Sequence, residues 1–310
     1  VADTRDNPPH AAKLGRDFAS VDLISGPYQP STFADIDGIA ISPGVPMSEA
    51  PVMAAVAKGI PVVGDVELFG QVLATAADRP KVIGITGSNG KSTVTTMVGE
   101  MCKAAGLNTV IAGNIGLPVL DALAEAEQAG GTSKPQCYVL ELSSFQLETT
   151  SSLDLDAATV LNVTEDHLDR YDDMAHYASA KARIFSRCRH QVLNREDRYS
   201  VAMKSSGNSV SYFARYAPLG PSHFGLSSVR GESWLAHDQM PLMTVADLPL
   251  AGGHNVANAL AALALARAID LPYPPIIEAL RRFRGLPHRV EKVMDIGTVG
   301  FYDDSKGTNV

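Results

Sequence analysis

The sequence predicts an α/β fold with a mostly parallel sheet. Short apolar runs bounded by glycine and proline alternate with longer stretches of helical periodicity, which is the pattern of strands joined by covering helices. One strand ends in a glycine-rich segment that leads directly into a helix, an arrangement typical of the ligand-binding edge of such sheets. The 310 residues exceed one typical domain, so we expect more than one globular unit.

A short strand and a helix flank the glycine-rich segment. Residues 81–86 are mostly apolar and follow Pro80, as expected of a buried strand. Residues 94–105 carry apolar side chains at helical spacing, and Gly106 stands where a helix commonly ends. The segment between them therefore lies at the carboxyl end of a strand and the amino end of a helix.

Residues 84–93, with the sequence GITGSNGKST, have the composition of a phosphate-binding loop. The backbone N–H groups of such a loop surround a polyphosphate, with Lys91 on the outer phosphates and the Ser92 hydroxyl on Mg²⁺. The common form of the motif needs glycine at position 85, where this chain has Ile85. A simple glycine turn before a helix is the alternative, and the flanking elements argue against it. The predicted nucleotide contacts are Gly87, Ser88, Asn89, Gly90, Lys91, Ser92 and Thr93.

The composition is that of a folded protein of the cytoplasm. Hydrophobic residues make up 45% and charged residues 19% of the chain, which argues against disorder. No apolar stretch approaches the roughly 20 residues that a membrane helix needs. A net charge of −8 argues against a nucleic-acid partner, and three cysteines without metal-like spacing indicate reduced thiols.

Before the loop, the chain shows two strands around one helix. We expect the strands at residues 37–42 and 60–64 and the helix at 49–58. Residues 1–5 are typical of the end of a strand, yet no strand–glycine–helix unit stands before them, so we expect an N-terminal truncation. We assign residues 1–70 to this first domain.

A larger central domain, residues 71–285, follows. Its predicted elements are strands at 138–142, 158–163 and 191–194, and helices at 174–188, 255–268 and 275–283. Residues 205–250 lack helical periodicity, and we expect short antiparallel strands and loops there. Residues 286–310 begin another domain and stop in a polar loop, so we expect the rest of a C-terminal domain to be missing.

Two polar groups follow apolar strands of this domain. Glu141 interrupts the run at 138–142, where a carboxylate is suited to Mg²⁺; an exposed sheet edge is the alternative, although an unpaired charge in such a run is costly. His167, in the polar segment 162–169, is suited to ligate a metal with Asp166 or a backbone group orienting its ring, or is an ordinary surface residue.

Lys181 falls within an apolar helical stripe. The stripe consists of Met174, Tyr177, Ala178, Ile184 and Phe185. A lysine there either lays its stem over apolar surface to reach water or has a functional amine, and periodicity does not separate the two.

Two later segments are also polar and rich in turn residues. In residues 252–258, GGHNVAN, Asn255 is a candidate N-cap or nucleotide contact. In residues 286–289, LPHR, Arg289 stands beside His288 on a loop that is a binding element or a simple hinge.

Taken together, these motifs resemble the Mur ligase family, the ATP-dependent amide ligases of peptidoglycan precursor synthesis. The motifs follow the family's order over nearly the whole chain: residues 86–93, 113–116, 141–148, 162–171, 180–181, 253–255, 286–289 and 304–306. Within the family, residues 113–116 and 141–148 favour the member that adds D-glutamate.

The resemblance implies a ligase of three domains: a Rossmann-like domain for UDP, an ATPase domain and a C-terminal domain for the amino acid. It implies ATP and two Mg²⁺ ions as cofactors, and UDP-N-acetylmuramoyl-L-alanine and D-glutamate as substrates of a cytoplasmic monomer. Alternatives are another Mur ligase, a folylpolyglutamate-type ligase, a nucleotide kinase or NTPase switch, or a nucleotide-binding fragment without activity.

The resemblance also implies roles for individual residues. It assigns the UDP site to Asp3, Thr4, Arg5, Ser42 and Gly44, and the muramoyl-alanine end to Asn114, Ser143, Gln146 and His167. It assigns adenine and ribose contacts to Asn258, Arg289 and Asp304, and the metal ions to Ser92, Glu141, His167 and Lys181. Lys181 corresponds to a carbamylated lysine, whose added CO₂ turns a cation into an anionic ligand. The implied catalytic residues are Lys91, Glu141, His167 and Lys181.

Overall fold

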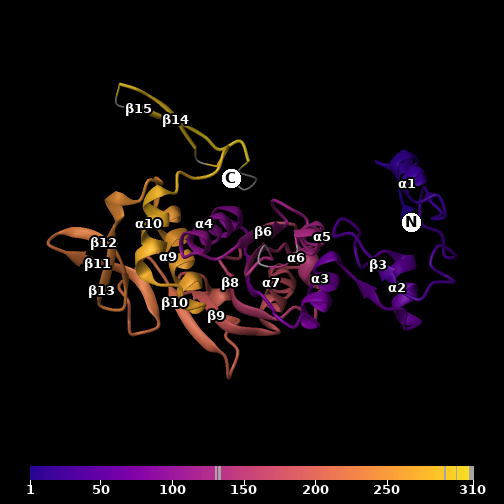
Figure 1. The fold of residues 1–310 in the computed structure, drawn as a ribbon, viewed down its shortest axis with the longest axis horizontal. Helices are drawn as coiled ribbons and strands as arrows, with labels where there is room; N and C mark the ends of the chain where they lie inside the picture. The colour runs from indigo at the N-terminus through magenta and orange to yellow at the C-terminus, as the bar shows by residue number, and fades with distance from the viewer. Residues whose placement is uncertain (130, 132–133, 290, 298, 307–310) are drawn as a thin grey trace. The chain divides into compact units, whose positions relative to one another are not determined.

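The computed structural model describes residues 1–129, 131, 134–289, 291–297 and 299–306. Contacts within the chain divide it into two compact units, Val1–Asp65 and Val66–Val310 (Figure 1). The predicted domain limits at residues 70 and 285 stay a prediction.

The first unit holds two small parallel strand pairs and two helices. Its elements are β1 (Ala2–Asp3), α1 (Ala11–Asp17), β2 (Ile24–Ser25), β3 (Ile39–Ala40), α2 (Ala50–Ala57) and β4 (Val62–Val63), with β1 paired to β2 and β3 to β4. Ile39, Ile41, Val52 and Ala55 form its buried core. The strands and helix predicted around residues 37–64 are present, and the strands are shorter than predicted because only two residues of each are paired.

The second unit is built on one nine-stranded sheet with the order β13-β12-β11-β10-β9-β8-β5-β7-β6. Its strands are β5 (Lys81–Thr86), β6 (Thr109–Gly113), β7 (Cys137–Glu141), β8 (Leu155–Val160), β9 (Cys188–Asn194), β10 (Ser209–Phe213), β11 (His223–Val229), β12 (Glu232–His237) and β13 (Met240–Thr244). All pairings from β6 to β11 are parallel, and those of β12 with its two neighbours are antiparallel. The mostly parallel sheet that the sequence predicts is therefore confirmed.

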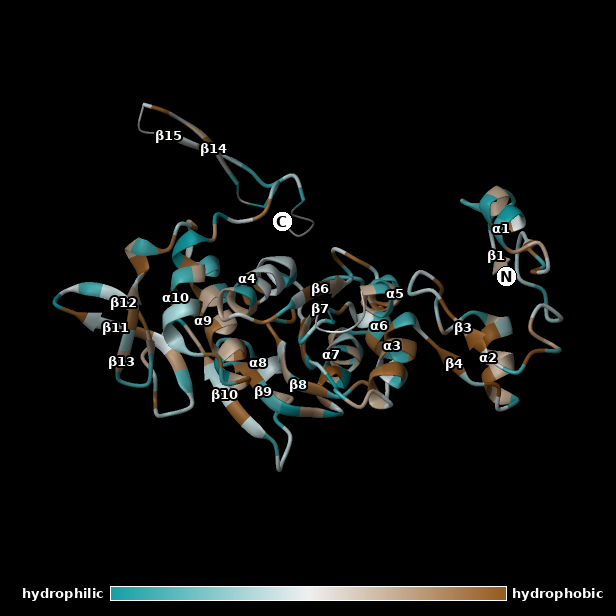
Figure 2. Cartoon of the chain, in the orientation of Figure 1, coloured by the Kyte–Doolittle hydropathy of each residue, from teal (hydrophilic) through white to brown (hydrophobic). Residues whose placement is uncertain are grey.

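Helices cover both faces of this sheet. The helices of this unit are α3 (Asp65–Ala74, which starts at the end of the first unit), α4 (Lys91–Ala104), α5 (Val119–Ala129), α6 (Ser144–Glu148), α7 (Met174–Ala182), α8 (Arg198–Ala202), α9 (Gly253–Ala268) and α10 (Tyr273–Arg282). One buried cluster joins the sheet to α4, α9 and α10, and a second joins it to α3, α5, α6 and α7. Alternate residues of β5 belong to different clusters: Ile83 and Ile85 pack in the first cluster, and Val82 packs in the second. Figure 2 shows hydrophobic residues in α3 and in parts of β8 and β9 of this unit.

Three predictions need correction. The helix predicted at residues 174–188 ends at Ala182, a 3-10 turn follows at Arg183–Phe185, and Cys188 already pairs with Leu155 of β8. The strands predicted at 158–163 and 191–194 begin three residues earlier, because their first residues are held by that same pairing. Within residues 205–250, β10 is parallel to β9 instead of antiparallel, whereas β11 to β13 are antiparallel as predicted.

A two-stranded antiparallel hairpin, β14 (Glu291–Ile296) and β15 (Val299–Asp303), follows α10. It forms its own sheet. Among the described residues, no helix is both long and apolar enough to cross a membrane.

Candidate active site

The glycine-rich loop joins β5, a central strand of the sheet, to the first turn of α4. Gly87 and Gly90 have φ angles of +152° and +83°, which favour glycine. A Cβ atom on Gly90 would lie 2.6 Å from the Asn258 side-chain oxygen, so that side chain and the loop approach as closely as they do because position 90 is glycine. The loop conformation thus follows from its glycines.

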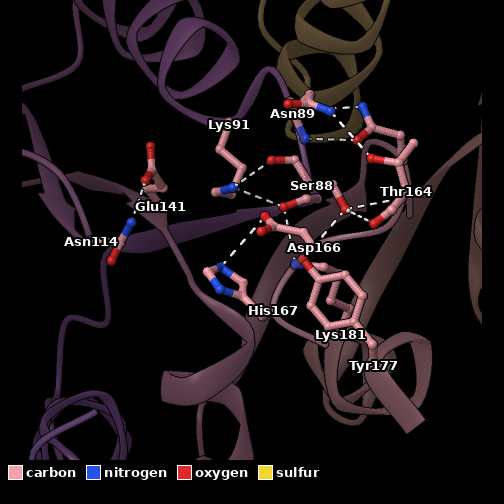
Figure 3. A network of polar contacts seen from close by, with 12 residues as sticks. Ser88, Asn89, Lys91, Asn114, Glu141, Thr164, Asp166, His167, Tyr177 and Lys181 are labelled. Carbon is pink, nitrogen blue, oxygen red and sulfur yellow. Dashed lines mark hydrogen bonds and ion pairs between the residues drawn. The ribbon is translucent and has the colours of Figure 1, made fainter. Parts of the chain in front are cut away.

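A second loop, after β8, holds the first one in place. The Ser88 hydroxyl accepts a hydrogen bond from the Thr164 N–H at 3.0 Å. The Asn89 N–H donates to the Asn162 side-chain oxygen at 2.8 Å, and the Asn162 amide returns a bond to the Asn89 carbonyl at 3.1 Å. Through these contacts the polar segment 162–169, which the sequence predicts to be part of a site, lies beside the glycine loop at the carboxyl edge of the sheet (Figure 3).

Two lysines converge on the glycine loop. Lys91 Nζ donates to the carbonyls of Gly87 and Ser88, both at 2.9 Å. Lys181 Nζ donates to the same Gly87 carbonyl at 3.0 Å and lies 4.4 Å from the centre of the Tyr177 ring. Lys181 is only 1% exposed. The interpretation in which its stem lies over apolar surface and its amine reaches water is therefore wrong.

Burial lowers the pKa of both amines. For Lys181, burial and then the nearby Lys91 charge bring the pKa to about 7. For Lys91, burial lowers the pKa, while the carboxylates of Glu141 and Asp166 act in the opposite direction. The Lys181 amine is therefore partly neutral near pH 7. The neutral form of an amine is the one that reacts with electrophiles.

Glu141 is the buried carboxylate of the site. It is the last residue of β7 and is 1% exposed. One of its oxygens accepts a hydrogen bond from the Asn114 amide at 2.7 Å, and the other, Oε2, has no hydrogen-bond partner among the described residues. A buried carboxylate oxygen without a donor is suited to a hard cation such as Mg²⁺. The alternative of an exposed sheet edge is wrong.

His167 lies at the rim of the same site. Its backbone φ is +55°, its Nε2 is 3.5 Å from an Asp166 carboxylate oxygen, and its ring centre is 4.9 Å from that of Phe145. Figure 3 shows it in the same group of polar side chains as Lys91 and Lys181. With 44% of its side chain exposed, it has room for a ligand.

Ser92 and the predicted acceptor residues also lie on elements of this edge. Ser92 is buried in the first turn of α4. Ser143 and Gln146 form the capping box of α6, directly after β7: the Ser143 hydroxyl accepts from the Gln146 N–H, and the Gln146 side chain accepts from the Ser143 N–H, each at 3.2 Å. Helix capping is therefore one reason for these residue types.

Nucleotide-sized space lies beside the glycine loop, in a pocket of about 600 Å³. Its lining includes Asn89, Gly90 and Thr93 of the loop and the three predicted adenine and ribose residues, Asn258, Arg289 and Asp304. Asn162, Thr164 and His254, from the predicted site segments 162–169 and 252–258, also line it. Sequence reasoning missed other lining residues, among them Asn194, Glu196, Asp197, Phe213 and Arg215. Several lie just after β9 and β10, and the rule that ligands bind at the carboxyl ends of parallel strands would have pointed to them.

An ion pair forms part of this wall. Arg215 Nη2 donates to Glu196 Oε1 at 2.9 Å and its Nε to both carboxylate oxygens at 3.1 and 3.2 Å. Burial raises the pKa of Glu196, but the hydrogen bonds from Arg215 outweigh this, so that the net pKa is lowered. The carboxylate is therefore charged at neutral pH.

The first unit has a pocket of its own, of about 670 Å³. All five residues predicted for the UDP site line it: Asp3, Thr4, Arg5, Ser42 and Gly44. Arg5 Nη2 lies 2.6 Å from Asp3 Oδ2, and the hydrogen bond from Arg5 lowers the pKa of Asp3 to about 2.

The predicted metal ligands do not form a ready-made cluster of metal-binding side chains. Within the part of the chain that the structure describes, the group of three such residues is His288, Glu291 and Asp303, in the β14–β15 hairpin. Of the four residues predicted to hold Mg²⁺, Glu141 is the single carboxylate, and Lys181 as an amine repels a cation. The set fits a divalent cation only if Lys181 carries an added acidic group.

The fold and the site define an α/β protein with a mostly parallel sheet and a glycine-rich loop between a central strand and a helix. Two family models match: the Mur ligase middle domain over residues 85–266 and the Mur ligase MurD-like N-terminal domain over residues 1–64. The chain belongs to the Mur ligase family. The family resemblance of the sequence motifs is thus confirmed.

Similar proteins include two named UDP-N-acetylmuramoylalanine–D-glutamate ligase. That of Methylobacillus flagellatus is 54% identical over 310 residues, and that of Thiobacillus denitrificans 55% over 320; the match covers all of this chain and 66% of each relative. The chain therefore spans slightly less than two thirds of their length.

Solved structures share the fold. The UDP-N-acetylmuramoyl-L-alanyl-D-glutamate–2,6-diaminopimelate ligase aligns with a TM-score of 0.62 at 21% identity, over 84% of this chain and 65% of that one. The UDP-N-acetylmuramate:L-alanyl-γ-D-glutamyl-meso-diaminopimelate ligase from Neisseria meningitides aligns with a TM-score of 0.60 at 19% identity, over 92% of this chain and 90% of that one.

Proposed function

We propose that this chain is the nucleotide-binding part of an ATP-dependent ligase that adds D-glutamate to UDP-N-acetylmuramoyl-L-alanine, with release of ADP and phosphate. The observation that carries the proposal is the arrangement of Lys91, Glu141 and Lys181 around one phosphate loop in a chain more than 50% identical to ligases of that name. We further propose a cytoplasmic monomer with three domains, bounded at residues 70 and 285.

In the proposed reaction, the terminal carboxylate of the acceptor attacks the γ-phosphorus of ATP, forming an acyl phosphate and releasing ADP. The D-glutamate amine then attacks the acyl carbon, and phosphate leaves as the amide bond forms. Lys91 carries the positive charge of the loop, and nucleotide phosphates would take the place of the Gly87 and Ser88 carbonyls as its acceptors. Positioning and charge stabilisation supply most of the catalysis in such transfers.

Ser92, Glu141, His167 and carbamylated Lys181 would hold the two Mg²⁺ ions. Support comes from the Glu141 oxygen that lacks a donor and from the partly neutral amine of Lys181, since neutral amines add CO₂. Bound Mg²⁺ would neutralise charge on the phosphates of ATP. Asn114 orients the Glu141 carboxylate through its 2.7 Å hydrogen bond.

The remaining predicted contacts are part of the same proposal. Asn258, Arg289 and Asp304 would bind adenine and ribose, and their shared pocket supports this. Asp3, Thr4, Arg5, Ser42 and Gly44 would bind UDP, and Asn114, Ser143, Gln146 and His167 the muramoyl-alanine end.

Product analysis tests the proposal. The chain is incubated with the acceptor, ATP, Mg²⁺ and single amino acids, and amide product and ADP are measured together. Product with D-glutamate alone supports the D-glutamate-adding ligase; product with another amino acid indicates a different Mur or folylpolyglutamate-type ligase. Nucleotide binding without amide product favours the nucleotide-binding fragment, and ADP formation without amide favours an NTPase.

A pair of variants tests the role of Lys181. Lys181→Ala should abolish ligation, and formate or acetate should restore part of it by replacing the lost carboxylate. Lys103→Ala, which removes an exposed lysine of α4, should remain fully active. A fully active Lys181→Ala variant would overturn this role.

A further inference from the structure

The pocket beside the glycine loop continues well past the loop. Asn258 of α9 lies against Gly90, and the helix begins five residues earlier at Gly253. At about 1.5 Å of rise per residue, this wall extends roughly 7–8 Å beyond the loop. A nucleotide with its phosphates on the loop needs this much room for its ribose and base.

Arg215 lies at that far end. Its Nη1 atom is so near the start of α9 that a Cβ atom on Gly253 would lie 3.0 Å from it. Glu196 holds the rest of the guanidinium through Nε and Nη2, and also accepts the Arg215 backbone N–H at 2.8 Å. Asn194 fixes Glu196 in turn, since its side-chain oxygen accepts the Glu196 N–H at 2.8 Å. The guanidinium is therefore clamped in one plane.

This clamp decides what Arg215 can recognise. Glu196 cancels its charge and occupies the donors along one edge, so Arg215 is poorly suited to a phosphate. Its planar face is left, and guanidinium planes stack on nucleic-acid bases. The Arg215 side chain is 48% exposed and lines the pocket, so this face is accessible.

We propose that Arg215, held flat by Glu196, is a nucleotide-binding residue that stacks on the base of the bound purine nucleotide. The inference rests on the nucleotide binding proposed above and adds a residue that the family resemblance does not assign. It predicts that Arg215 contributes to recognition of the base and not of the phosphates.

Binding of MgADP and of inorganic triphosphate to the unchanged chain and its variants tests this, by displacement of a fluorescent ATP analogue. Arg215→Ala should weaken MgADP binding about tenfold, as expected for one base-stacking contact. Arg215→Lys should behave like the alanine variant because an ammonium has no plane to stack. The affinity for inorganic triphosphate, obtained from the same displacement measurement, should be the same in all variants.

Arg195→Ala is the matched control. Arg195 follows β9 and stands next to Glu196 in the chain; it contacts the Ala217 carbonyl and is not among the described residues that line the pocket, so its removal should leave MgADP affinity unchanged. Equal MgADP affinity of Arg215→Ala and the unchanged chain would overturn the inference while leaving the proposed function intact. An equal loss for MgADP and triphosphate would overturn it too. Failure of the unchanged chain to bind any nucleotide would overturn both.

Discussion

Lys91 and Lys181 donate hydrogen bonds to one and the same carbonyl oxygen, that of Gly87, at 2.9 and 3.0 Å. Two amines on one acceptor place two cationic groups side by side in a buried site. This is why the Lys91 charge, after burial itself, lowers the pKa of Lys181. Lys91 of the glycine loop thus adds to the effect of burial on the pKa of Lys181 in α7.

A first prediction concerns the pH dependence of stability. The pKa of Lys181 is lowered from 10.5 to about 7 on folding, so between these values the unfolded chain binds the extra proton. The contribution of Lys181 to stability therefore rises with pH across this window and is least favourable below pH 7. Lys181→Met should be most stabilising, relative to the unchanged chain, at pH 6, and its advantage should shrink towards pH 9.5. Urea unfolding in CO₂-free buffer measures this.

Lys103→Met is the control for that measurement. Lys103 is about half exposed on α4, where it pairs with Glu100, so its replacement should change stability by a similar small amount at both pH values. The lowered pKa of Lys181 would be contradicted if the difference in free energy of unfolding between Lys181→Met and the unchanged chain stayed constant from pH 6 to pH 9.5.

A second prediction concerns Mg²⁺ and Glu141. Because Glu141 Oε2 has no donor, a Glu141→Gln variant loses a cation ligand and no hydrogen bond seen in the structure. Mg²⁺ should tighten ADP binding to the unchanged chain, and the Mg²⁺ affinity of the nucleotide complex should fall about tenfold or more in the variant. Calorimetry of ADP binding over a Mg²⁺ series measures this. Glu100→Gln, an exposed neutralisation on α4, should show the unchanged Mg²⁺ dependence; equal Mg²⁺ dependence in both variants would exclude Glu141 as a ligand.

Local signals singled out the residues that the structure brings together around the glycine loop. Residues 81–86 form β5 with both ends as predicted, because Pro80 and the following glycines mark the strand limits. Glu141 was found from a single charge in an apolar run, which needs no knowledge of distant residues. Lys181 was found as a member of an apolar stripe, but its burial depends on the packing of α7 against the loop of Gly87.

Long-range pairing explains what the sequence did not predict. The helix predicted to reach residue 188 ends early because Cys188 pairs with Leu155, a partner 33 residues away. The Glu196–Arg215 pair likewise depends on the parallel register of β9 and β10, which brings the ends of the two strands together. Periodicity within one segment carries no information on such register.

A third prediction concerns acid stability and Glu67. This residue, 4% exposed, accepts the N–H groups of Ser151 and Ser152 at 2.6 and 2.9 Å. Burial raises its pKa, but these bonds outweigh burial and lower the pKa from 4.5 to about 2. Its stabilisation is therefore present above pH 4.5 and is lost as the pH falls towards 2.

Glu67→Gln should accordingly lower the free energy of unfolding by about 1–3 kcal/mol at pH 7. The difference in unfolding free energy from the unchanged chain should narrow as the pH falls from 4.5 towards 2, because Glu67 is protonated first in the unfolded state and only at lower pH in the folded state. Urea unfolding at pH 7, 4 and 2.5 measures it. If the difference in free energy of unfolding between Glu67→Gln and the unchanged chain were the same at all three pH values, Glu67 would act through its shape and not its charge.

The last prediction separates two reasons for glycine, one at the end of strand β6 and one just after helix α4. Gly113 has a φ of +108°, and a Cβ atom there would lie 2.3 Å from the backbone oxygen of Glu141, an atom that cannot swing away. Gly106, with a φ of +90°, has open space around its missing side chain. Gly106→Ala should therefore cost only the left-handed strain of about 1–2 kcal/mol, whereas Gly113→Ala should cost about 1–3 kcal/mol more because the strand must shift. Since that shift would displace Asn114, which donates to Glu141 through both its backbone and its side chain, Gly113→Ala should also weaken Mg²⁺-dependent ADP binding. Equal losses of unfolding free energy in the two variants would contradict the close approach of Gly113 to Glu141.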